Sequence, residues 1–498
     1  MPENPLGYAW LKDHFKLGEY HLTHTSSVGT RLRKEIDENG NVTETYPPHY
    51  IPGINPLDHV EFALKYDDLN LDFLKTVFTR MNLEEITESI NKKPKAAYHR
   101  RIGFLYEFLT GIEIPVPNQP KTNYINLIDE EKYVTGKIIK NRRWLINDNL
   151  PGTPDFCPVI RKTIHLQNIL KEDFKKLVEK VAHSFPPDIF HRAVNYLYTK
   201  ETRSSYQIEK EKPTPEHVGR FVRLLEKAGE QPLRELLSEA QLTTLQNEIV
   251  DPRYAAAGFR HFQNYIGQTT LNYKQIVHYV CPPPQFVNSL MNGLLTSVEK
   301  MEESPAVIRA TVAAFAFVFI HPFEDGNGRL HRFLIHDMLT RCGVVPKGMI
   351  IPVSAHMVNH IKEYDTALES YSKPLLIRVR YEMDEEQKMM VNNPAEVEGY
   401  LRYQDLTIQS VYLGRTIKGT IEEDIYREME FLMNYDEVKS AIRNIVDMPD
   451  KKIDLIIKII HQNKGMFPNR RRNQFEELSN DEISKMQNAF REIFNIPL

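Results

Sequence analysis

The chain has 498 residues, a formal net charge of −4, 41% hydrophobic residues and 26% charged residues. These values are those of an ordinary globular protein with enough length for two or three hydrophobic cores, and they exclude a disordered chain. They give no overall positive charge that would attract nucleic acid, although local basic clusters remain possible. The three cysteines, Cys157, Cys281 and Cys342, have no spacing typical of a metal site or a disulfide framework, which indicates a reducing compartment.

No targeting or membrane segment is predicted. The first residues, Met1 to Pro5, lack the basic region and apolar run of a signal peptide. The longest nearly apolar run, from Ala310 to Ile320, is too short to span a bilayer. We therefore expect a cytoplasmic protein without a membrane partner.

The first third of the chain carries no catalytic pattern. Prolines interrupt residues 1 to about 60, where Asn39-Gly40-Asn41 predicts a hairpin turn. Apolar residues recur at helical spacing from Pro56 to Gly111, and prolines with short β-branched runs predict loops or small β-structure from Ile112 to Pro158. The basic cluster between Lys92 and Arg101 is a candidate for contact with nucleic acid, although such clusters are more often solvated surface.

From Leu170 the pattern is strongly helical, with two features before the central motif. Ser205 and Glu209 lie four residues apart on one helical face, which on its own describes an ordinary helix surface. The polar, β-prone segment from Gln268 to Cys281 is followed by three prolines and predicts a hairpin.

The most informative stretch is HPFEDGNGRLHR, from His321 to Arg332. Upstream, Ser304-Pro305 predicts the start of a helix that is apolar on nearly every side up to Ile320. Downstream, apolar residues recur at helical spacing until Gly343, a helix stop. The reactive residues are therefore expected on a loop between two core helices and in the first turn of the second helix.

Several of these residues suit a phosphate ligand. A helix N-terminus offers unpaired N–H groups and a partial positive charge to an anion. Gly326 and Gly328 allow the backbone to approach a phosphate closely. Arg329 and Arg332 lie three apart on the helix, and their forked donors match phosphate oxygens.

Two further residues suit catalysis on such a ligand. Asp325 is a hard oxygen ligand of the kind that Mg²⁺ takes when it is shared with substrate phosphates. His321 titrates near neutral pH and can remove a proton from a hydroxyl. Each residue alone has a common structural explanation, but the ordered set predicts phosphoryl or nucleotidyl transfer.

The stretch resembles the H-x-F-x-D/E-G-N-G-R-x-x-R signature of Fic-domain proteins at every defined position. This family mostly transfers AMP from ATP to a hydroxyl side chain of a target protein. The resemblance implies that His321 is the general base, Asp325 the Mg²⁺ ligand and Phe323 the residue that anchors the loop in the core. It also implies the phosphate-binding residues, which are Gly326, Asn327 and Gly328 at the α- and β-phosphates and Arg329 and Arg332 at the β- and γ-phosphates.

A second segment resembles the S/T-x-x-x-E-G/N inhibitory helix of the Fic class with an N-terminal intramolecular inhibitor. Ser205 and Glu209 match, whereas Lys210 replaces the Gly or Asn that ends the helix in the left-handed conformation. We expect Glu209 to form a bidentate ion pair with Arg332 and so to misalign the α-phosphate of bound ATP. Lys210 leaves the helix end, and the strength of inhibition, open.

The remaining segments complete the organisation. The predicted hairpin resembles the Fic flap, whose edge would hold an extended target segment by strand addition. Near the C-terminus, Ile453 to Ile460 form an apolar stripe, and Ser479 with Glu482 predicts a capping box. Two helices joined by the basic turn at Asn469 to Arg472 would suit a winged-helix-like module.

We therefore predict a mainly α-helical protein, with an all-helical Fic core at 186–385 and a small β-hairpin flap, flanked by largely helical domains at 1–185 and 386–498. The predicted function is a Mg²⁺- and ATP-dependent protein adenylyltransferase, autoinhibited by Glu209, that acts on an unknown target protein or on itself. Alternatives are another nucleotide or the removal of AMP at the same site, and a DNA-binding regulator that uses the basic flanks. A nucleotide-binding module without catalysis is disfavoured because His321 and Asp325 are both present.

Overall fold

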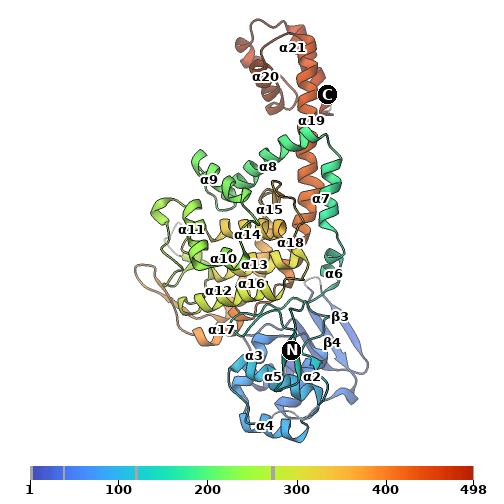
Figure 1. Cartoon of the computed structure of the whole chain (residues 1–498), viewed down its shortest axis with the longest axis vertical. Coiled ribbons are helices and arrows are strands. Elements are labelled where there is room, and N and C mark those ends of the chain that lie inside the picture. The colour runs from blue at the N-terminus through green and yellow to red at the C-terminus, as the bar shows by residue number, and fades with distance from the viewer. Residues whose placement is uncertain (1–3, 38–39, 118–121, 271–274, 497–498) are drawn as a thin grey trace.

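The structure, a computed structural model, describes residues 4–37, 40–117, 122–270 and 275–496. The molecule is elongated. The N-terminal region lies at one end, a large helical region in the centre and a small C-terminal lobe at the other end (Figure 1). The described residues are mainly α-helical with only small sheets, as predicted. Within them, no helix combines the length and apolar character that crossing a membrane requires.

The N-terminal region combines helices with two small sheets. The first sheet has the order β1-β2-β4-β3, and the second has the order β5-β7-β6. The strands are β1 (Pro5–Leu6), β2 (His24–Val28), β3 (Arg33–Ile36), β4 (Val42–Tyr46), β5 (Ile125–Asn126), β6 (Ile139–Asn141) and β7 (Ile146–Asp148). The helices are α1 (Gly7–His14), α2 (Pro56–Tyr66), α3 (Leu71–Arg80), α4 (Leu83–Lys92) and α5 (Ala97–Thr110).

This region is less helical than predicted. Strands β3 and β4 pair antiparallel and form the hairpin expected at residues 39–41, of which Asn39 lies outside the described residues. The rest of the first sheet was not predicted, because its strands are largely polar and β2 pairs in parallel with β4, which is not its neighbour in the sequence. Such strands lack the regular apolar alternation that would identify them.

Part of the basic cluster serves the fold and not a nucleic-acid surface. Arg100 is buried and donates hydrogen bonds to the backbone carbonyls of Asn123 and Leu145. Arg101 donates two hydrogen bonds to the carbonyl of Asn126. These arginines therefore connect α5 to the segment that leads into the second sheet, and only the lysines at its start are exposed.

The central region is built around the antiparallel pair α13 (Ala306–Ile320) and α14 (Asn327–Arg341). Every residue of α13 from Val307 onward is buried, as its apolar sequence predicts. Gly343 follows α14 with a φ of +70°, which ends the helix as expected. The surrounding helices are α6 (Ile164–Leu170), α7 (Phe174–His183), α8 (Pro187–Ile208), α9 (Pro215–Glu226), α10 (Leu233–Leu236), α11 (Glu239–Ile249), α12 (Pro284–Lys300), α15 (Val353–Asn359), α16 (Ile361–Arg378), α17 (Pro394–Arg402) and α18 (Thr407–Gly419).

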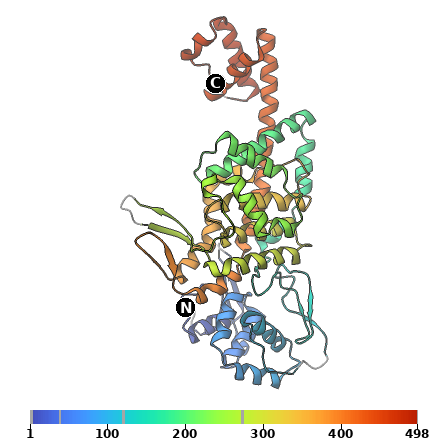
Figure 2. The ribbon, with the colours of Figure 1, turned by 60° about the vertical axis from the view of Figure 1, so that its left-hand side comes forward.

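Two β-hairpins project from the same side of this centre (Figure 2). Strands β8 (Tyr265–Thr269) and β9 (Gln275–Val280) form the predicted hairpin, with a register shift between Ile266 and Gly267. Strands β10 (Tyr381–Met383) and β11 (Met389–Val391) form the second hairpin. The domain boundary predicted at residue 385 falls inside this second hairpin, and the central core continues to Met429. The division into three domains stays a prediction.

The C-terminal lobe stands on one long helix. From α18 the chain passes through the π-helical turn η3 (Thr420–Ile425) into α19 (Tyr426–Ile445), whose far end packs with α20 (Asp450–Gln462) and α21 (Asn480–Ile493). Ser479 and Glu482 form the predicted capping box. Residues 463–479 separate the last two helices, which is too long for a helix-turn-helix turn, and the described residues 426–496 contain no strand that could form a wing. The lobe therefore differs from the winged-helix-like module that we expected.

Candidate active site

The loop between α13 and α14 begins and ends with a left-handed residue. His321 has a φ of +53° at the C-terminus of α13, and Gly326 has a φ of +86° at the N-terminus of α14. Glycine adopts this conformation without strain, whereas a histidine there costs roughly 1–3 kcal/mol and needs support from its surroundings. The prediction that this stretch forms a loop between two core helices is confirmed.

His321 has the protonation state that a general base requires. Its side chain is buried, and its Nδ1 lies 3.2 Å from the carbonyl oxygen of Val318. Because a carbonyl only accepts, Nδ1 carries the proton and Nε2 keeps its lone pair. Burial and, next in size, the positive charge of Arg260 lower the pKa of His321 to about 4. The imidazole is therefore neutral at physiological pH.

Phe323 and Asn327 hold the loop in shape. Phe323 is fully buried and packs edge-on against Phe259, with ring centroids 5.5 Å apart. The Asn327 side chain accepts a hydrogen bond from the Phe323 N–H at 3.0 Å and donates one to the Phe323 carbonyl at 2.9 Å. Its side-chain oxygen and one of its two side-chain N–H donors are therefore used to hold the loop.

Arg332 is fully buried and meets the predicted inhibitory segment. Its Nε donates to Ser205 Oγ at 2.7 Å, and its Nη2 donates to the Ser205 carbonyl at 2.9 Å and to Glu209 Oε1 at 2.8 Å. The structure thus brings Ser205, Glu209 and Arg332 together from distant parts of the sequence. The ion pair uses one carboxylate oxygen instead of the expected two, because Ser205 occupies the other donors on that side of the guanidinium.

Helix α8 ends at this contact despite Lys210. Lys210 adopts a φ of +59°, its N–H donates to the Gln207 carbonyl, and the N–H of Glu211 donates to the Tyr206 carbonyl. This pair of bonds is the Schellman arrangement, in which the left-handed residue is usually glycine. The lysine therefore takes the required conformation at a cost of roughly 1–2 kcal/mol.

Gly328 lies directly against the Glu209 carboxylate. A Cβ at this position would lie 2.0 Å from Glu209 Oε1, so only glycine leaves room for the carboxylate. The carboxylate therefore occupies space beside the first turn of α14, where a helix N-terminus favours an anion.

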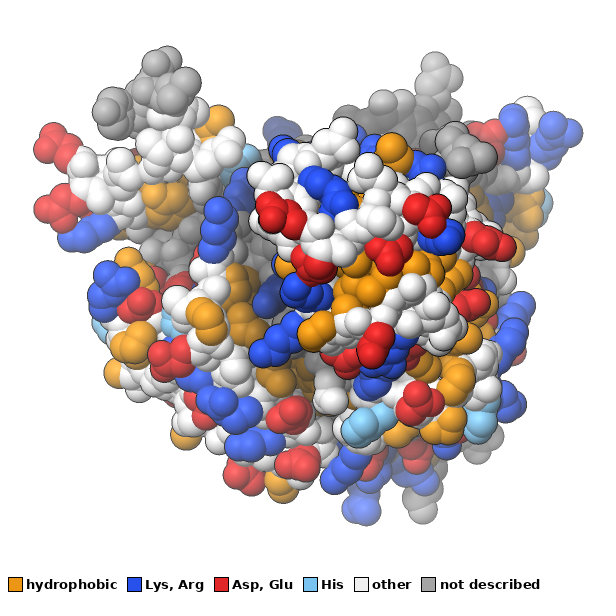
Figure 3. All heavy atoms as spheres, turned by 90° about the horizontal axis from the view of Figure 1, so that it is seen from above, with side chains coloured by type: hydrophobic (Ala, Val, Ile, Leu, Met, Phe, Trp, Pro, Cys, Tyr) orange, Lys and Arg blue, Asp and Glu red, His pale blue; other side chains and the backbone are white. Residues whose placement is uncertain are grey.

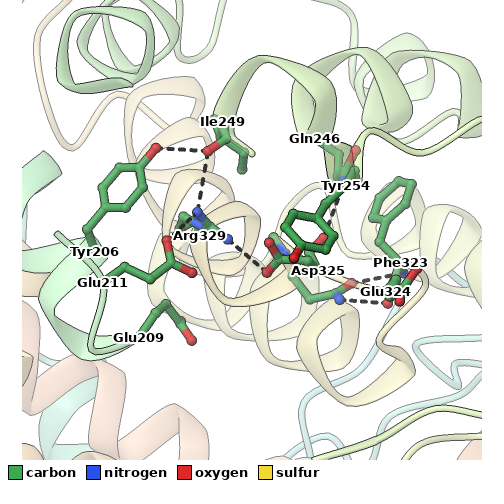
Figure 4. A network of polar contacts seen from close by, with 12 residues as sticks. Tyr206, Glu209, Glu211, Gln246, Ile249, Tyr254, Phe323, Glu324, Asp325 and Arg329 are labelled. Atoms are coloured by element: carbon green, nitrogen blue, oxygen red, sulfur yellow. Dashed lines mark hydrogen bonds and ion pairs between the residues drawn. The ribbon is translucent and has the colours of Figure 1, made fainter. Parts of the chain in front are cut away.

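A second carboxylate, which the sequence analysis missed, occupies Arg329 (Figure 4). Arg329 Nη1 contacts Glu211 Oε2 at 2.9 Å, and its Nη2 contacts Asp325 Oδ1 at 2.8 Å. The guanidinium also lies over the ring of Tyr206, at 5.1 Å from the centroid. Glu211 follows Glu209 by two residues, and only the reversal of the chain at Lys210 turns both toward α14. The pattern Glu-Lys-Glu was the available signal, but it does not reveal that reversal.

Asp325 fits a metal ion that is shared with a nucleotide, but not an ion held by protein groups alone. Its side chain is 41% exposed, and its Oδ1 accepts hydrogen bonds from the Gly326 N–H and from Arg329. Among the residues that the structure describes, no group of three His, Cys, Asp or Glu side chains could hold a metal. Mg²⁺ commonly binds one or two carboxylates and completes its shell with phosphates and water. The donor set therefore fits this shared mode.

One segment of the chain, which includes the loop between α13 and α14, matches a known family. Residues 236–339 match the Fic/DOC family. The "Protein adenylyltransferase Fic" of Aedes aegypti is 36% identical over 100 residues, and that of Culex quinquefasciatus is 34% identical over 100 residues. Each alignment covers 20% of this chain and 18% of the relative, so the chain spans under a fifth of their length.

Other matches are shorter or more distant. A Fido domain-containing protein of Dictyostelium discoideum is 33% identical over 93 residues, which cover 18% of this chain and 63% of that protein. The crystal structure of a Fic family protein from Desulfovibrio desulfuricans aligns with a TM-score of 0.38 at 16% identity, over 56% of this chain and 80% of the other.

Proposed function

We propose that the domain at residues 236–339, which matches the Fic/DOC family, transfers AMP from ATP to a hydroxyl side chain of a protein. The modified protein is a separate target or the chain itself. The observation that carries the proposal is the neutral, buried His321 on a loop that leads into a helix N-terminus with two arginines. The printed names of the two mosquito relatives support the same activity.

The residues of the site divide the reaction among them. Nε2 of His321 accepts the proton of the attacking hydroxyl, whose oxygen forms a bond to the α-phosphorus. The bond between this phosphorus and the bridging oxygen of the β-phosphate breaks, and pyrophosphate leaves. Arg329, Arg332 and the N–H groups of the first turn of α14 bind the phosphate oxygens. Asp325 would hold Mg²⁺ together with the phosphates, and the ion supplies positive charge to the leaving group.

The same arrangement supports autoinhibition by the end of α8. Glu209 contacts Arg332, and Glu211 contacts Arg329, so both proposed phosphate clamps carry an internal carboxylate. A nucleotide can reach its productive orientation only when these arginines are released. Glu209 thus lowers the rate through the alignment of the α-phosphate, and misalignment can cost several kcal/mol of barrier.

DNA binding by the basic flanks stays a prediction, and the basic residues exposed there are Lys92, Lys93, Lys95, Arg470 and Arg471. The arginines of the N-terminal cluster hold backbone carbonyls, and the view onto the C-terminal end shows acidic and basic side chains interspersed instead of one basic face (Figure 3).

The direct test is transfer of a radiolabel from ATP that is labelled at the α-phosphate. The purified full chain is incubated with Mg²⁺, alone and with a cell extract, as wild type, Glu209→Gly and His321→Ala. We expect incorporation that increases in Glu209→Gly and decreases roughly 10²–10⁴-fold in His321→Ala. Label from the γ-phosphate should not be incorporated. Absence of incorporation in Glu209→Gly, or equal incorporation in His321→Ala, would contradict the proposal.

A further inference from the structure

A buried arginine outside the motif connects the flap to the proposed base. Arg260 is 5% exposed and lies just before β8. Its Nε donates to the His321 carbonyl at 2.7 Å, and its Nη2 donates to the carbonyls of Pro282 at 2.6 Å and Ile320 at 3.3 Å. Its Nη1 donates to the Phe262 carbonyl at 2.8 Å. No carboxylate forms an ion pair with it in the described part of the chain, so backbone carbonyls bind its charge.

The four carbonyls belong to two structural features. Phe262 and Pro282 flank the hairpin β8–β9, one on each side of its base. Ile320 and His321 are the last residue of α13 and the strained residue that follows it. One planar guanidinium therefore fixes both ends of the flap relative to the backbone of His321, the proposed general base. A lysine cannot reproduce this fork of donors.

The segment around Arg260 and the side chain of Gln246 in α11 bind the rest of the catalytic loop. The Arg260 N–H donates to the Pro322 carbonyl at 2.8 Å. Asn264 Nδ2 lies 3.3 Å from the Glu324 carbonyl, and Gln246 Nε2 donates to the Asp325 carbonyl at 3.2 Å (Figure 4). Together with the Asn327 contact, these bonds give every carbonyl from Ile320 to Asp325 a donor. A non-glycine residue stays in the left-handed conformation only when many surrounding contacts hold it there.

We propose that Arg260 is a positioning residue, which holds His321 in its left-handed conformation and sets the base of the flap against it, so that a target segment on the flap presents its hydroxyl to Nε2. This inference rests on the proposed function for its catalytic part. Binding of ATP should not depend on Arg260, because four of its five N–H donors bind backbone carbonyls and the phosphate clamps lie on α14.

The test compares Arg260→Lys and Arg260→Gln in the activated Glu209→Gly chain. The matched control is Arg100→Lys, which alters another buried arginine that donates to backbone carbonyls, in the N-terminal region. A displacement of the base by about 1 Å can cost 10²-fold. We therefore expect kcat for AMP incorporation into the chain itself to fall about 100-fold in both Arg260 variants, with KM for ATP unchanged and with melting temperatures close to that of the control.

Hydrogen exchange in the absence of nucleotide separates this inference from the proposed function. In Arg260→Lys, amides of residues 321–326 and of the flap strands should exchange at least about tenfold faster, whereas amides within α13 keep their wild-type rates. If no variant incorporates AMP, the proposed function fails and the exchange rates alone decide the role of Arg260. Wild-type exchange in both segments, or faster exchange throughout the centre, would overturn the inference.

Discussion

At the residue scale, the environment of His321 determines when the site can act. Burial and Arg260 lower its pKa from an ordinary value of about 6.5 to about 4, so the base stays neutral well into the acidic range. A solvent-exposed histidine in the same role would lose its lone pair to a proton just below neutral pH. This difference can be measured.

The first prediction concerns the pH dependence of transfer. In Glu209→Gly at saturating ATP, kcat should change little between pH 7.5 and pH 5, because His321 is protonated only near pH 4. A base with a pKa of 6.5 would instead lose roughly 30-fold at pH 5. Initial rates of AMP incorporation in buffers of constant ionic strength measure this. A decline centred near pH 6.5 would show that the titrating base is not a buried histidine of this kind.

The same shift has a consequence for stability. Between pH 6.5 and pH 4 the unfolded histidine binds a proton that the folded one does not bind. The free energy of unfolding therefore carries the full contribution of His321 above pH 6.5, and this contribution decreases as pH falls toward 4. We expect the melting temperature of His321→Gln to depend less on pH in this window than that of the wild type.

At the element scale, the C-terminal end of α8 acts as one unit with two carboxylates. Glu209 and Glu211 lie on either side of Lys210, and each contacts one arginine of α14. The Glu209 pair is slightly more buried, with side chains 0% exposed for Arg332 and 35% for Glu209, against 3% for Arg329 and 43% for Glu211. We therefore expect Glu209 to contribute more to inhibition than Glu211.

The second prediction follows from these two ion pairs. Glu209→Gly should raise the initial rate of AMP incorporation at least about tenfold, which corresponds to about 1.4 kcal/mol. Glu211→Gln should raise it by a smaller factor, and the two changes together should not be additive, because both free the same nucleotide site. Glu216→Gln, at an exposed glutamate in the first turn of α9, is the control for Glu211→Gln.

Substitution of the arginine tests whether the contact is the cause. Arg332→Ala also removes the ion pair with Glu209, yet it should not activate, because a phosphate clamp is lost with it. The double variant of Glu209→Gly and Arg332→Ala should therefore resemble Arg332→Ala alone. An unchanged or lower rate in Glu209→Gly would mean that the end of α8 is not inhibitory, or that Glu209 serves the removal of AMP.

The third prediction concerns the strained residue between the carboxylates. Lys210→Gly removes a left-handed penalty of roughly 1–2 kcal/mol but adds backbone entropy to the unfolded chain, so the helix end should gain roughly 0.5–1 kcal/mol. Inhibition becomes tighter, and basal transfer by the otherwise wild-type chain should fall about two- to fivefold. Lys212→Gly, at an exposed lysine without a positive φ, should show neither effect. Faster transfer in Lys210→Gly would contradict this account.

The elements that the sequence predicted correctly are those with a strong local signal. The apolar run of α13, the glycine after α14 and the capping box of Ser479 and Glu482 each leave a pattern in adjacent residues. Arg260 leaves no such pattern, and the Glu-Lys-Glu pattern at Glu211 does not reveal its partner. The partners of Glu211 and Arg260 lie 118 and 61 residues away and are defined only by the folded chain. The meeting of Glu209 with Arg332 was predictable only through resemblance to a family.

At the scale of the whole molecule, α8 joins the catalytic centre to the helix that carries the C-terminal lobe. Its Lys200 pairs with Glu428 of α19 at 2.9 Å, and its Arg192 pairs with Asp436 through both carboxylate oxygens. In its middle, the fully buried Glu201 accepts hydrogen bonds from His336 and Ser354 of the centre. The C-terminal end of α8, which we propose to be inhibitory, is thus held by contacts along the whole helix.

The N-terminal region is attached to the centre by a buried ion pair. Asp72 of α3 contacts both terminal nitrogens of Arg378 at the end of α16, and both side chains are less than 10% exposed. The guanidinium also lies over the ring of Tyr20, 3.9 Å from its centroid. A charge in such a place is tolerated only while its partner remains, because it cannot be hydrated by bulk water.

The fourth prediction is that this pair determines whether the two regions unfold together. Asp72→Ala leaves the Arg378 charge buried without its partner and should destabilise the protein by about 3–5 kcal/mol. The double change Asp72→Leu with Arg378→Met should recover most of this loss, because no buried charge remains. Glu35→Ala is the control, since it breaks an ion pair of the same region whose side chains are more than half exposed, and it should cost under about 1 kcal/mol. Calorimetric unfolding of the four proteins provides the measurement. We expect Asp72→Ala to unfold in two separate transitions, with the N-terminal region first. A single transition at the temperature of the control would show that the ion pair does not hold the regions together.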